Sequence, residues 1–163
     1  MVNTKLNSNH VFNLISEIPD PEIPVLTIKD LGILRDVKWM DNSYQIDITP
    51  TYTACPAIPF ISDEIKRILN DYGIQNYKLS VVYEPAWSTD WLTTEAKLKL
   101  KQYGIAPPMH TSCAKKLDAS KQVQCPRCNS HKTTLLSQFG STACKALYTC
   151  KSCKEVFDYF KCH

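Results

Sequence analysis

"SYQIDITPTYTACPAIPFISDEIKRIL", residues 43–69, joins a strand pattern to a helix pattern through a loop that carries one cysteine. Apolar and polar residues alternate from Tyr44 to Thr49, which predicts a half-buried β-strand. Isoleucines recur at three- and four-residue spacing from Ile58 to Ile68, which predicts an amphipathic helix. Because proline is tolerated only in the first turn of a helix, Pro59 places the start of this helix no earlier than residues 56–57.

The same two periodicities, followed outward, predict an α+β fold. The expected order is helix, strand, strand, helix, strand, helix. A hairpin followed by a crossover to a third strand gives a small mixed three-stranded sheet packed with helices. The first flanking element is a helix around Val11–Ile18, capped by Asn9 and ended by Pro19. Strands are expected at Leu31–Trp39 and Leu79–Tyr83. The last element is a helix from Ser88 or Thr89 to Tyr103, closed by Gly104.

Two C-x₂-C pairs dominate the tail of the chain. Cys125 and Cys128 are separated from Cys150 and Cys153 by 21 residues, a spacing typical of structural zinc. Four thiolates complete a tetrahedron around one ion and leave no open position for catalysis. One such pair would also fit a redox dithiol, but two pairs do not need that interpretation. Short strand patterns at 133–139, 146–149 and 156–160 complete the prediction of a C-terminal zinc ribbon.

These patterns divide the chain into three parts. We expect an α/β domain at 1–105, a linker at 106–121 that contains Pro107 and Pro108, and the zinc ribbon at 122–163. About forty residues cannot build an adequate apolar core, so the ion is expected to supply folding energy.

The remaining tail cysteines exceed what one zinc ion needs. Cys144 and Cys162 either pack near the ribbon or form a second metal site or a transient iron–sulfur site. His131 is expected to pack or lie exposed near the ribbon. Cys113 and His110 lie in the linker and are expected to be unpaired.

Composition and charge narrow the functional classes. The 163 residues are 44% hydrophobic, contain no apolar run of the ~18 residues that a membrane span needs, and show no signal-peptide pattern. We therefore expect a cytoplasmic protein, in which paired cysteines favour metal over disulfides. Residues 1–107 carry a net charge of −3 and residues 121–163 a net charge of +5. A zinc-bound tail would be only mildly basic, which argues against nucleic-acid binding.

Cys55 is predicted to lie directly before a helix N-terminus. Free backbone N–H groups and the positive end of the helix dipole favour a thiolate there, so we expect a depressed thiol pKa. An inert core cysteine is the alternative. Asp20, Glu22 and Asp30 in the preceding loop could hold iron transiently with this thiol, or could cap the loop. No histidine between His10 and His110 is available as a catalytic base.

Two sequence stretches resemble a known family. "DPEIPVLTIKDLGIL" (20–34) and "TPTYTACP" (49–56) are similar to the small α/β family of metal–sulfur cluster maturation factors, which includes SufT-type proteins and the cytosolic iron–sulfur targeting factor. The tail "FGSTACKALYTCKSCKEVFDYFKCH" (139–163) resembles, more narrowly, the accessory proteins encoded beside the multicomponent phenylacetyl-CoA epoxidase. The resemblance implies that residues 1–105 form a metal–sulfur cluster assembly-like α/β domain. It also implies a reactive cysteine at Cys55 and an acidic loop at Asp20, Glu22 and Asp30.

The resemblance also implies a function and partners. It implies a non-catalytic factor that helps insert or repair iron in the diiron oxygenase subunit, or the [2Fe–2S] cluster in the flavin-containing reductase subunit. General iron–sulfur assembly proteins could be further partners. An adaptor that stabilises the complex without handling iron is the alternative. A catalytic subunit ranks lower, because the paired Glu-x-x-His ligands of a permanent diiron site are absent. A homodimer through an exposed sheet edge also stays open.

Overall fold

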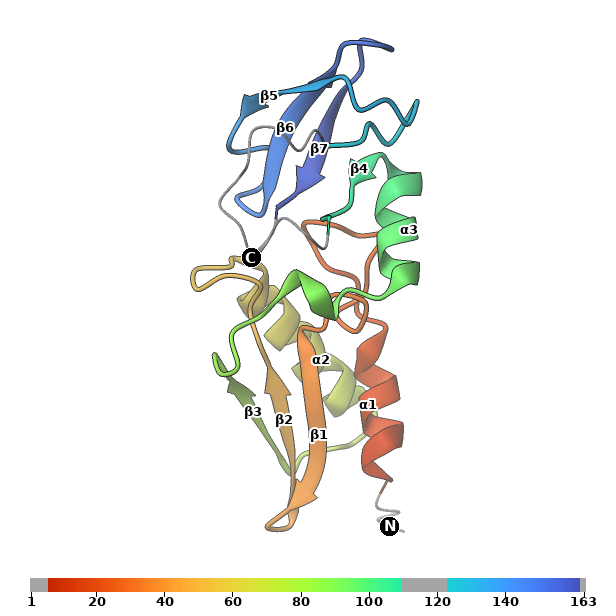
Figure 1. Cartoon of the computed structure of the whole chain (residues 1–163). Coiled ribbons are helices and arrows are strands. Elements are labelled where there is room, and N and C mark those ends of the chain that lie inside the picture. Colours follow the sequence, from red (N-terminus) through yellow and green to blue (C-terminus); the bar gives the residue numbers. More distant parts are fainter. Residues whose placement is uncertain (1–5, 110–122, 162–163) are drawn as a thin grey trace. The chain divides into compact units, whose positions relative to one another are not determined.

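The computed structural model describes residues 6–109 and 123–161. The contacts of the chain group into two compact units that divide between Trp87 and Ser88 (Figure 1). None of the described helices has the length and apolar character required to cross a membrane.

The first unit contains the predicted mixed sheet. Strands β1 (Leu34–Met40), β2 (Ser43–Ile48) and β3 (Tyr77–Val81) form a sheet in the order β1-β2-β3. β1 pairs antiparallel to β2, and β2 pairs parallel to β3, so the predicted hairpin and crossover are confirmed. Helix α1 (Ser8–Ser16) packs on β1, and helix α2 (Ala57–Asp71) makes the crossover between β2 and β3.

The core of this unit follows from the alternation in β2 and the isoleucine spacing in α2. Ile46 and Ile48 of β2 are fully buried, as are Ile61 and Ile65 of α2. The hairpin turn has positive φ at both central residues, 49° at Asp41 and 60° at Asn42. This conformation suits a two-residue hairpin, and asparagine and aspartate tolerate it best among residues other than glycine.

The ends of several elements differ from the sequence prediction, among them β3, which spans Tyr77–Val81 instead of Leu79–Tyr83. The cap of α1 is Asn7, whose side chain accepts a hydrogen bond from the N–H of Asn9, the residue predicted to cap. β1 starts at Leu34 instead of Leu31, because the preceding residues form an irregular loop held by its own backbone hydrogen bonds. The indole N–H of Trp87 also donates to the Leu31 carbonyl of this loop at 2.7 Å.

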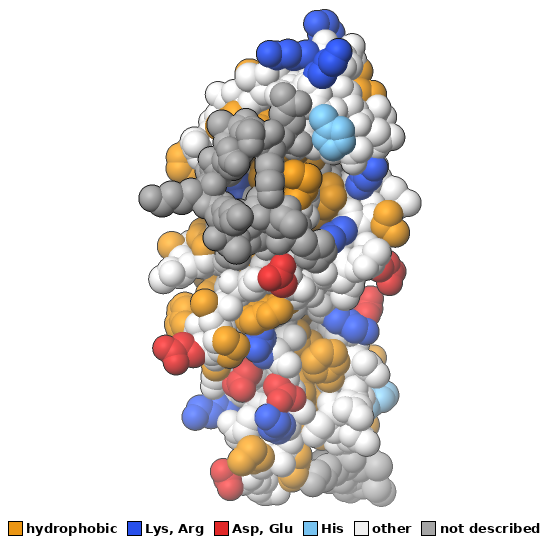
Figure 2. Space-filling model, in the orientation of Figure 1, with side chains coloured by type: hydrophobic (Ala, Val, Ile, Leu, Met, Phe, Trp, Pro, Cys, Tyr) orange, Lys and Arg blue, Asp and Glu red, His pale blue; other side chains and the backbone are white. Residues whose placement is uncertain are grey.

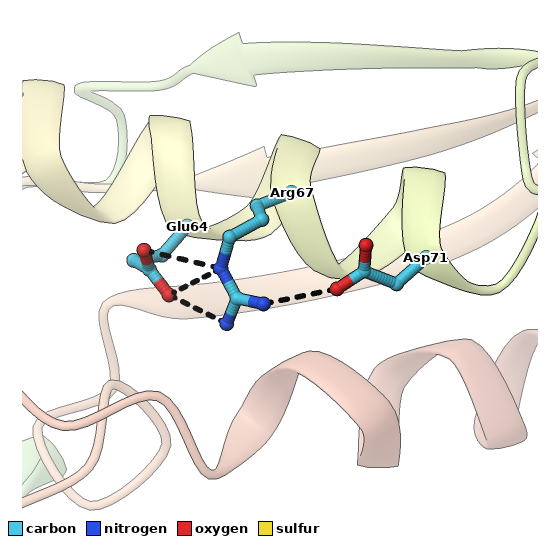
Figure 3. Close-up of polar contacts among 3 residues, drawn as sticks. All are labelled: Glu64, Arg67 and Asp71. Atoms are coloured by element: carbon cyan, nitrogen blue, oxygen red, sulfur yellow. Dashed lines mark hydrogen bonds and ion pairs between the residues drawn. The ribbon is translucent and has the colours of Figure 1, made fainter.

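The outer face of α2 is polar and faces solvent. The guanidinium of Arg67 bonds to Glu64 and Asp71, one turn away on either side, with N–O distances of 2.9 Å (Figure 3). Exposed ion pairs of this kind contribute little to the free energy of unfolding; the charged side chains keep this face of the helix polar and hydrated. The buried isoleucines therefore lie on the opposite face, against the sheet.

The second unit contains a short 3₁₀ turn and α3, followed by a four-stranded sheet. The predicted last helix is split in two, because Leu92 is extended between the 3₁₀ turn η1 (Thr89–Trp91) and α3 (Thr94–Tyr103). Gly104, with φ of 98°, ends α3 as predicted. The sheet has the order β4-β7-β6-β5 and comprises β4 (Ile105–Ala106), β5 (Thr133–Ser137), β6 (Lys145–Cys150) and β7 (Val156–Phe160).

The boundary between the two units differs from the expected domain limits. β4 pairs parallel with Asp158 and Tyr159 of β7, and Ala106 packs in the ribbon core with Phe157 and Tyr159. This pairing groups α3 and β4 with the ribbon, whereas the sequence patterns assign residues up to 105 to the first domain. Most of the expected linker, residues 110–121, lies outside the described residues.

Candidate functional site

The four cysteines of the two C-x₂-C pairs meet at one point. The sulfur atoms of Cys125, Cys128, Cys150 and Cys153 all lie within 4.8 Å of one another. Cys125 and Cys153 have their sulfurs 3.7 Å apart, and Cys128 and Cys150 have theirs 3.5 Å apart. Four sulfurs at about 2.3 Å from a central zinc ion are about 3.8 Å from one another in a tetrahedron. The donor set and its spacing therefore fit a tetrahedral metal site.

The two C-x₂-C pairs are built by the same local hydrogen bonds. The N–H of Asn129 donates to the Cys125 carbonyl at 3.0 Å, and the N–H of Lys154 donates to the Cys150 carbonyl at 2.9 Å. Asn129 and Lys154 both have positive φ, 61° and 67°, which turns the chain back toward the ribbon. Each turn thereby aims two sulfurs inward.

Two of the four sulfurs differ in how readily they ionise. The pKa of Cys150 is lowered to about 6, chiefly because the backbone N–H of Cys153 donates to its sulfur, with a further contribution from the N–H of Ser152. The N–H of Glu155 lowers the pKa of Cys153, but desolvation and the neighbouring sulfurs outweigh this effect and raise it to about 12. Metal ligands must be thiolates, so a thiol that ionises readily at neutral pH is prepared for a cation. Cys125 and Cys150 are fully buried, whereas Cys128 is exposed, so the site lies at one end of the ribbon core.

The proposed second metal site has no support among the described residues. Cys144 is buried, and its sulfur lies 3.0 Å from the Thr142 hydroxyl and away from the four-cysteine cluster. His131 is exposed and is not a member of that cluster. Cys162 lies outside the described residues, as do the linker residues Cys113 and His110, whose "HTSC" stretch (110–113) could bind metal weakly.

Cys55 lies where the sequence predicts it, directly before α2. Residue 56 is the N-cap of this helix, and the Cys55 carbonyl accepts a hydrogen bond from the N–H of Ile58. The thiol is hydrogen-bonded by the backbone of Ala57 and the side chain of Thr51. Only 8% of Cys55 is exposed, so this cysteine is held in place and largely shielded from water.

The expectation that Cys55 has a depressed pKa is wrong. Burial raises the pKa of the Cys55 thiol above its ordinary value; hydrogen bonds from Ala57 and Thr51 lower it in part, and the charges of Glu22 and Asp20 raise it further. Desolvation and nearby carboxylates outweigh the favourable position at a helix N-terminus. The same carboxylates that disfavour an isolated thiolate would stabilise a cation at this place.

Two of the three loop acids, Asp20 and Asp30, cap backbone N–H groups. Asp20 is buried, and its Oδ1 accepts hydrogen bonds from the N–H groups of Glu22 and Ile23 at 2.9 and 2.7 Å. Asp30 and Thr27 cap each other's backbone N–H groups, each at 3.1 Å. Capping therefore accounts for the positions of Asp20 and Asp30.

Among the described residues, the four-cysteine cluster is the only group of three or more cysteine, histidine or acidic side chains placed to hold a metal ion. The Cys55 region is therefore not a preformed metal cage.

We expect the raised pKa to make Cys55 slow to alkylate. The thiol stays protonated to a higher pH than an unperturbed cysteine, so iodoacetamide should modify it more slowly at pH 7, with a rate that rises only at alkaline pH. Since the folded-state pKa lies above the unfolded value, the stability linked to this group is complete below the unfolded pKa and is lost as the pH rises through the raised pKa. Mass spectrometry with peptide mapping measures the rate.

Glu22→Gln removes one carboxylate charge and should speed this alkylation at a given pH. Cys55→Ala identifies the modified peptide. Rapid modification of Cys55 at pH 7 in the folded protein would contradict the prediction.

Two family models match this chain and define its class. The model described as iron-sulfur cluster assembly protein matches residues 9–72, and the model described as PaaD zinc beta ribbon domain matches residues 110–161. The class is thus an iron–sulfur cluster assembly domain joined to a C-terminal zinc ribbon. A protein of Escherichia coli (strain K12), provisionally named as a component of 1,2-phenylacetyl-CoA epoxidase, is 49% identical over 94% of this chain and 92% of its own length. The chain belongs to the PaaD family.

Other relatives match only the first part of the chain. A Bacillus subtilis (strain 168) protein named Fe-S protein maturation auxiliary factor YitW is 33% identical over 56% of this chain and 90% of its own length. The crystal structure of a domain of unknown function, DUF59, from Bacillus anthracis superposes with a TM-score of 0.52 and 28% identity. It covers 57% of this chain and 90% of that domain. The fold around Cys55 is therefore shared with proteins that lack the ribbon.

Proposed function

We propose that this chain is an accessory maturation factor for a multicomponent phenylacetyl-CoA epoxidase in aerobic phenylacetate degradation. It assists the insertion of iron or a [2Fe–2S] cluster into the oxygenase or reductase subunit, in the cytoplasm, and turns over no substrate of its own. One observation carries the proposal: a domain similar to named Fe–S maturation factors is joined to the PaaD ribbon in one chain. The similarity to the E. coli protein supports the epoxidase as the client.

The two sites have separate tasks in this proposal. Cys125, Cys128, Cys150 and Cys153 hold a structural zinc ion, which supplies folding energy that the small ribbon core lacks. Cys55 receives iron as cargo: the charges of Glu22 and Asp20 attract the cation, and the thiol releases its proton to water as sulfur binds. A protonated resting thiol suits transient binding, because it releases the metal more readily than a thiolate cage.

A non-catalytic adaptor is the second candidate. Asp20 and Asp30 are engaged in caps, and Cys55 is buried with a raised pKa, which also fits a purely structural role for all three residues. In that case the chain binds and stabilises the epoxidase complex without handling iron.

Metal analysis of the clients separates these candidates. The oxygenase and reductase subunits are purified from cells that carry the wild-type protein, Cys55→Ala, or no factor, and their iron and [2Fe–2S] contents are measured. If Cys55 handles iron, Cys55→Ala should leave a client as iron-poor as the deletion does. Cys144→Ala is the matched control, because it also removes a buried cysteine outside the zinc site. Normal metal content in all strains would overturn the maturation proposal and favour the adaptor.

A further inference from the structure

The edge strands of the two sheets differ in how they are protected from pairing with other chains. Exposed edge strands usually carry charges or are very short, which prevents pairing with other chains. Among the described strands, β1 and β3 are the edges of the first sheet, and each carries charged residues; β4, an edge of the second sheet, has two residues. β5, the other edge of the second sheet, reads TTLLS and has no charged residue and no proline.

β5 also exposes two leucines, Leu135 and Leu136. Leu135 lies opposite Tyr148 of β6, and the register shifts after it, so that Leu136 has no partner position on β6. Leu135 is 40% exposed and Leu136 is 52% exposed. The first part of the strand keeps regular pairing and offers an edge that another strand could extend. Phe139, just beyond β5, is 65% exposed and enlarges this apolar surface.

Cations lie at both ends of the β5 edge. Lys132 is exposed directly before the strand, and its carbonyl accepts a hydrogen bond from the N–H of Lys151 at 2.7 Å, which brings a second exposed lysine beside it. After the strand, the Lys161 ammonium donates to the Gln138 carbonyl at 3.1 Å and lies 4.7 Å from the centre of the Phe139 ring. Figure 2 shows Lys and Arg side chains gathered at the end of the ribbon that carries the β6–β7 loop.

Acids are scarce around this edge. Between residues 123 and 161 the sequence holds six Lys/Arg and only two Asp/Glu, Glu155 and Asp158. Asp158 is occupied by Lys145 and by the hydroxyl of Ser141. Lys161 is held by the Gln138 carbonyl and the Phe139 ring but keeps its charge, so all three lysines that flank β5 can attract an acidic partner.

We propose that the β5 edge docks an extended segment of a client protein, with an apolar centre and acidic residues at its ends. The segment adds a strand to the ribbon sheet through backbone hydrogen bonds, contacts the two leucines with its centre, and meets the flanking lysines with its ends. This inference deepens the proposed function, on which the identity of the client rests. A second copy of the chain fits less well, because it would bring the same cations to the same edge.

Two matched variants test the docking surface. Leu136→Lys and Leu98→Lys introduce the same charge in the same unit at positions of equal exposure, 52% in β5 and 53% in α3. Dissociation constants of the full-length protein for the purified oxygenase and reductase subunits are measured by calorimetry, after circular dichroism and zinc content confirm an intact fold. We expect Leu136→Lys to weaken binding of one subunit by at least about tenfold, while Leu98→Lys binds as the wild type. Binding should also weaken as the salt concentration rises.

Peptide probes test the chemistry of the partner. A nine-residue peptide with a valine and threonine centre and two glutamates at each end should bind the wild type. The same peptide with lysine ends should not. Equal binding of both peptides, equal binding of the two variants, or no binding of either subunit by the wild type would overturn the proposal. The proposal would also be overturned if the Leu98→Lys variant is a dimer and the Leu136→Lys variant is a monomer, because a second copy of the chain would then occupy the β5 edge.

The metal analysis of the client subunits distinguishes a failure of the docking proposal from a failure of the proposed maturation function. If binding depends on Leu136 while client iron is normal without the factor, docking stands and maturation fails. If Leu136→Lys binds normally while Cys55→Ala leaves the client iron-poor, maturation stands and this docking surface fails.

Discussion

Replacing Cys125 by serine should unfold the ribbon sheet and abolish its metal binding, while the first unit keeps its fold. The sulfur of Cys125 is one of four in the cluster and is fully buried, and a serine hydroxyl does not replace a thiolate ligand. Structural zinc sites contribute on the order of 10 kcal/mol to folding, more than a small ribbon core can replace. Zinc stoichiometry should fall well below one per chain. Limited proteolysis should cut within the ribbon and spare residues of α2 and β2.

Cys144→Ser provides the control for this experiment. Cys144 is also a buried cysteine of the second unit, but it lies outside the cluster, and a serine can keep a hydrogen bond with Thr142. We expect this variant to bind one zinc ion and to resist proteolysis as the wild type does. A Cys125→Ser protein with full zinc content and an unaltered ribbon would contradict the structural role of the cluster.

Asp20→Ala should cause the second large loss, in the stability of the first unit. The buried Asp20 carboxylate accepts hydrogen bonds from two backbone N–H groups, those of Glu22 and Ile23. Alanine leaves both donors without this acceptor, and a buried unsatisfied donor costs about 1–3 kcal/mol. We therefore expect the free energy of unfolding to fall by about 2–4 kcal/mol. Urea denaturation followed by tryptophan fluorescence measures this change.

Asp20→Asn separates the structural from the chemical role of this residue. An amide oxygen can still accept from the same N–H groups, so the loss should be within about 1 kcal/mol, while the negative charge beside Cys55 is gone. A folded Asp20→Asn protein that delivers less iron would show that the charge acts on the thiol. If Asp20→Ala is as stable as the wild type, the capping role is wrong.

Several features of this protein follow from local sequence patterns. The alternation of β2 and the isoleucine spacing of α2 each bury a single face, and that requirement specifies strand and helix before any long-range contact forms. Pro59 limits where α2 begins, so the position of Cys55 before the helix also follows from the sequence. The doubled C-x₂-C spacing predicts the four-cysteine cluster, because each turn is formed by bonds between near neighbours.

Other features depend on residues far apart in the chain. The pKa of Cys55 rises because folding buries the thiol and brings Glu22 and Asp20 near it, so a helix N-terminus alone predicts the wrong direction. β4 belongs to the ribbon sheet only through its parallel pairing with β7, and β5 is an edge only because of the strand order. Local patterns indicate which face of a helix or strand is buried. Desolvation, electrostatic fields and strand order depend on tertiary contacts, and in this protein they determine the protonation state of the Cys55 thiol and make β5 an edge strand.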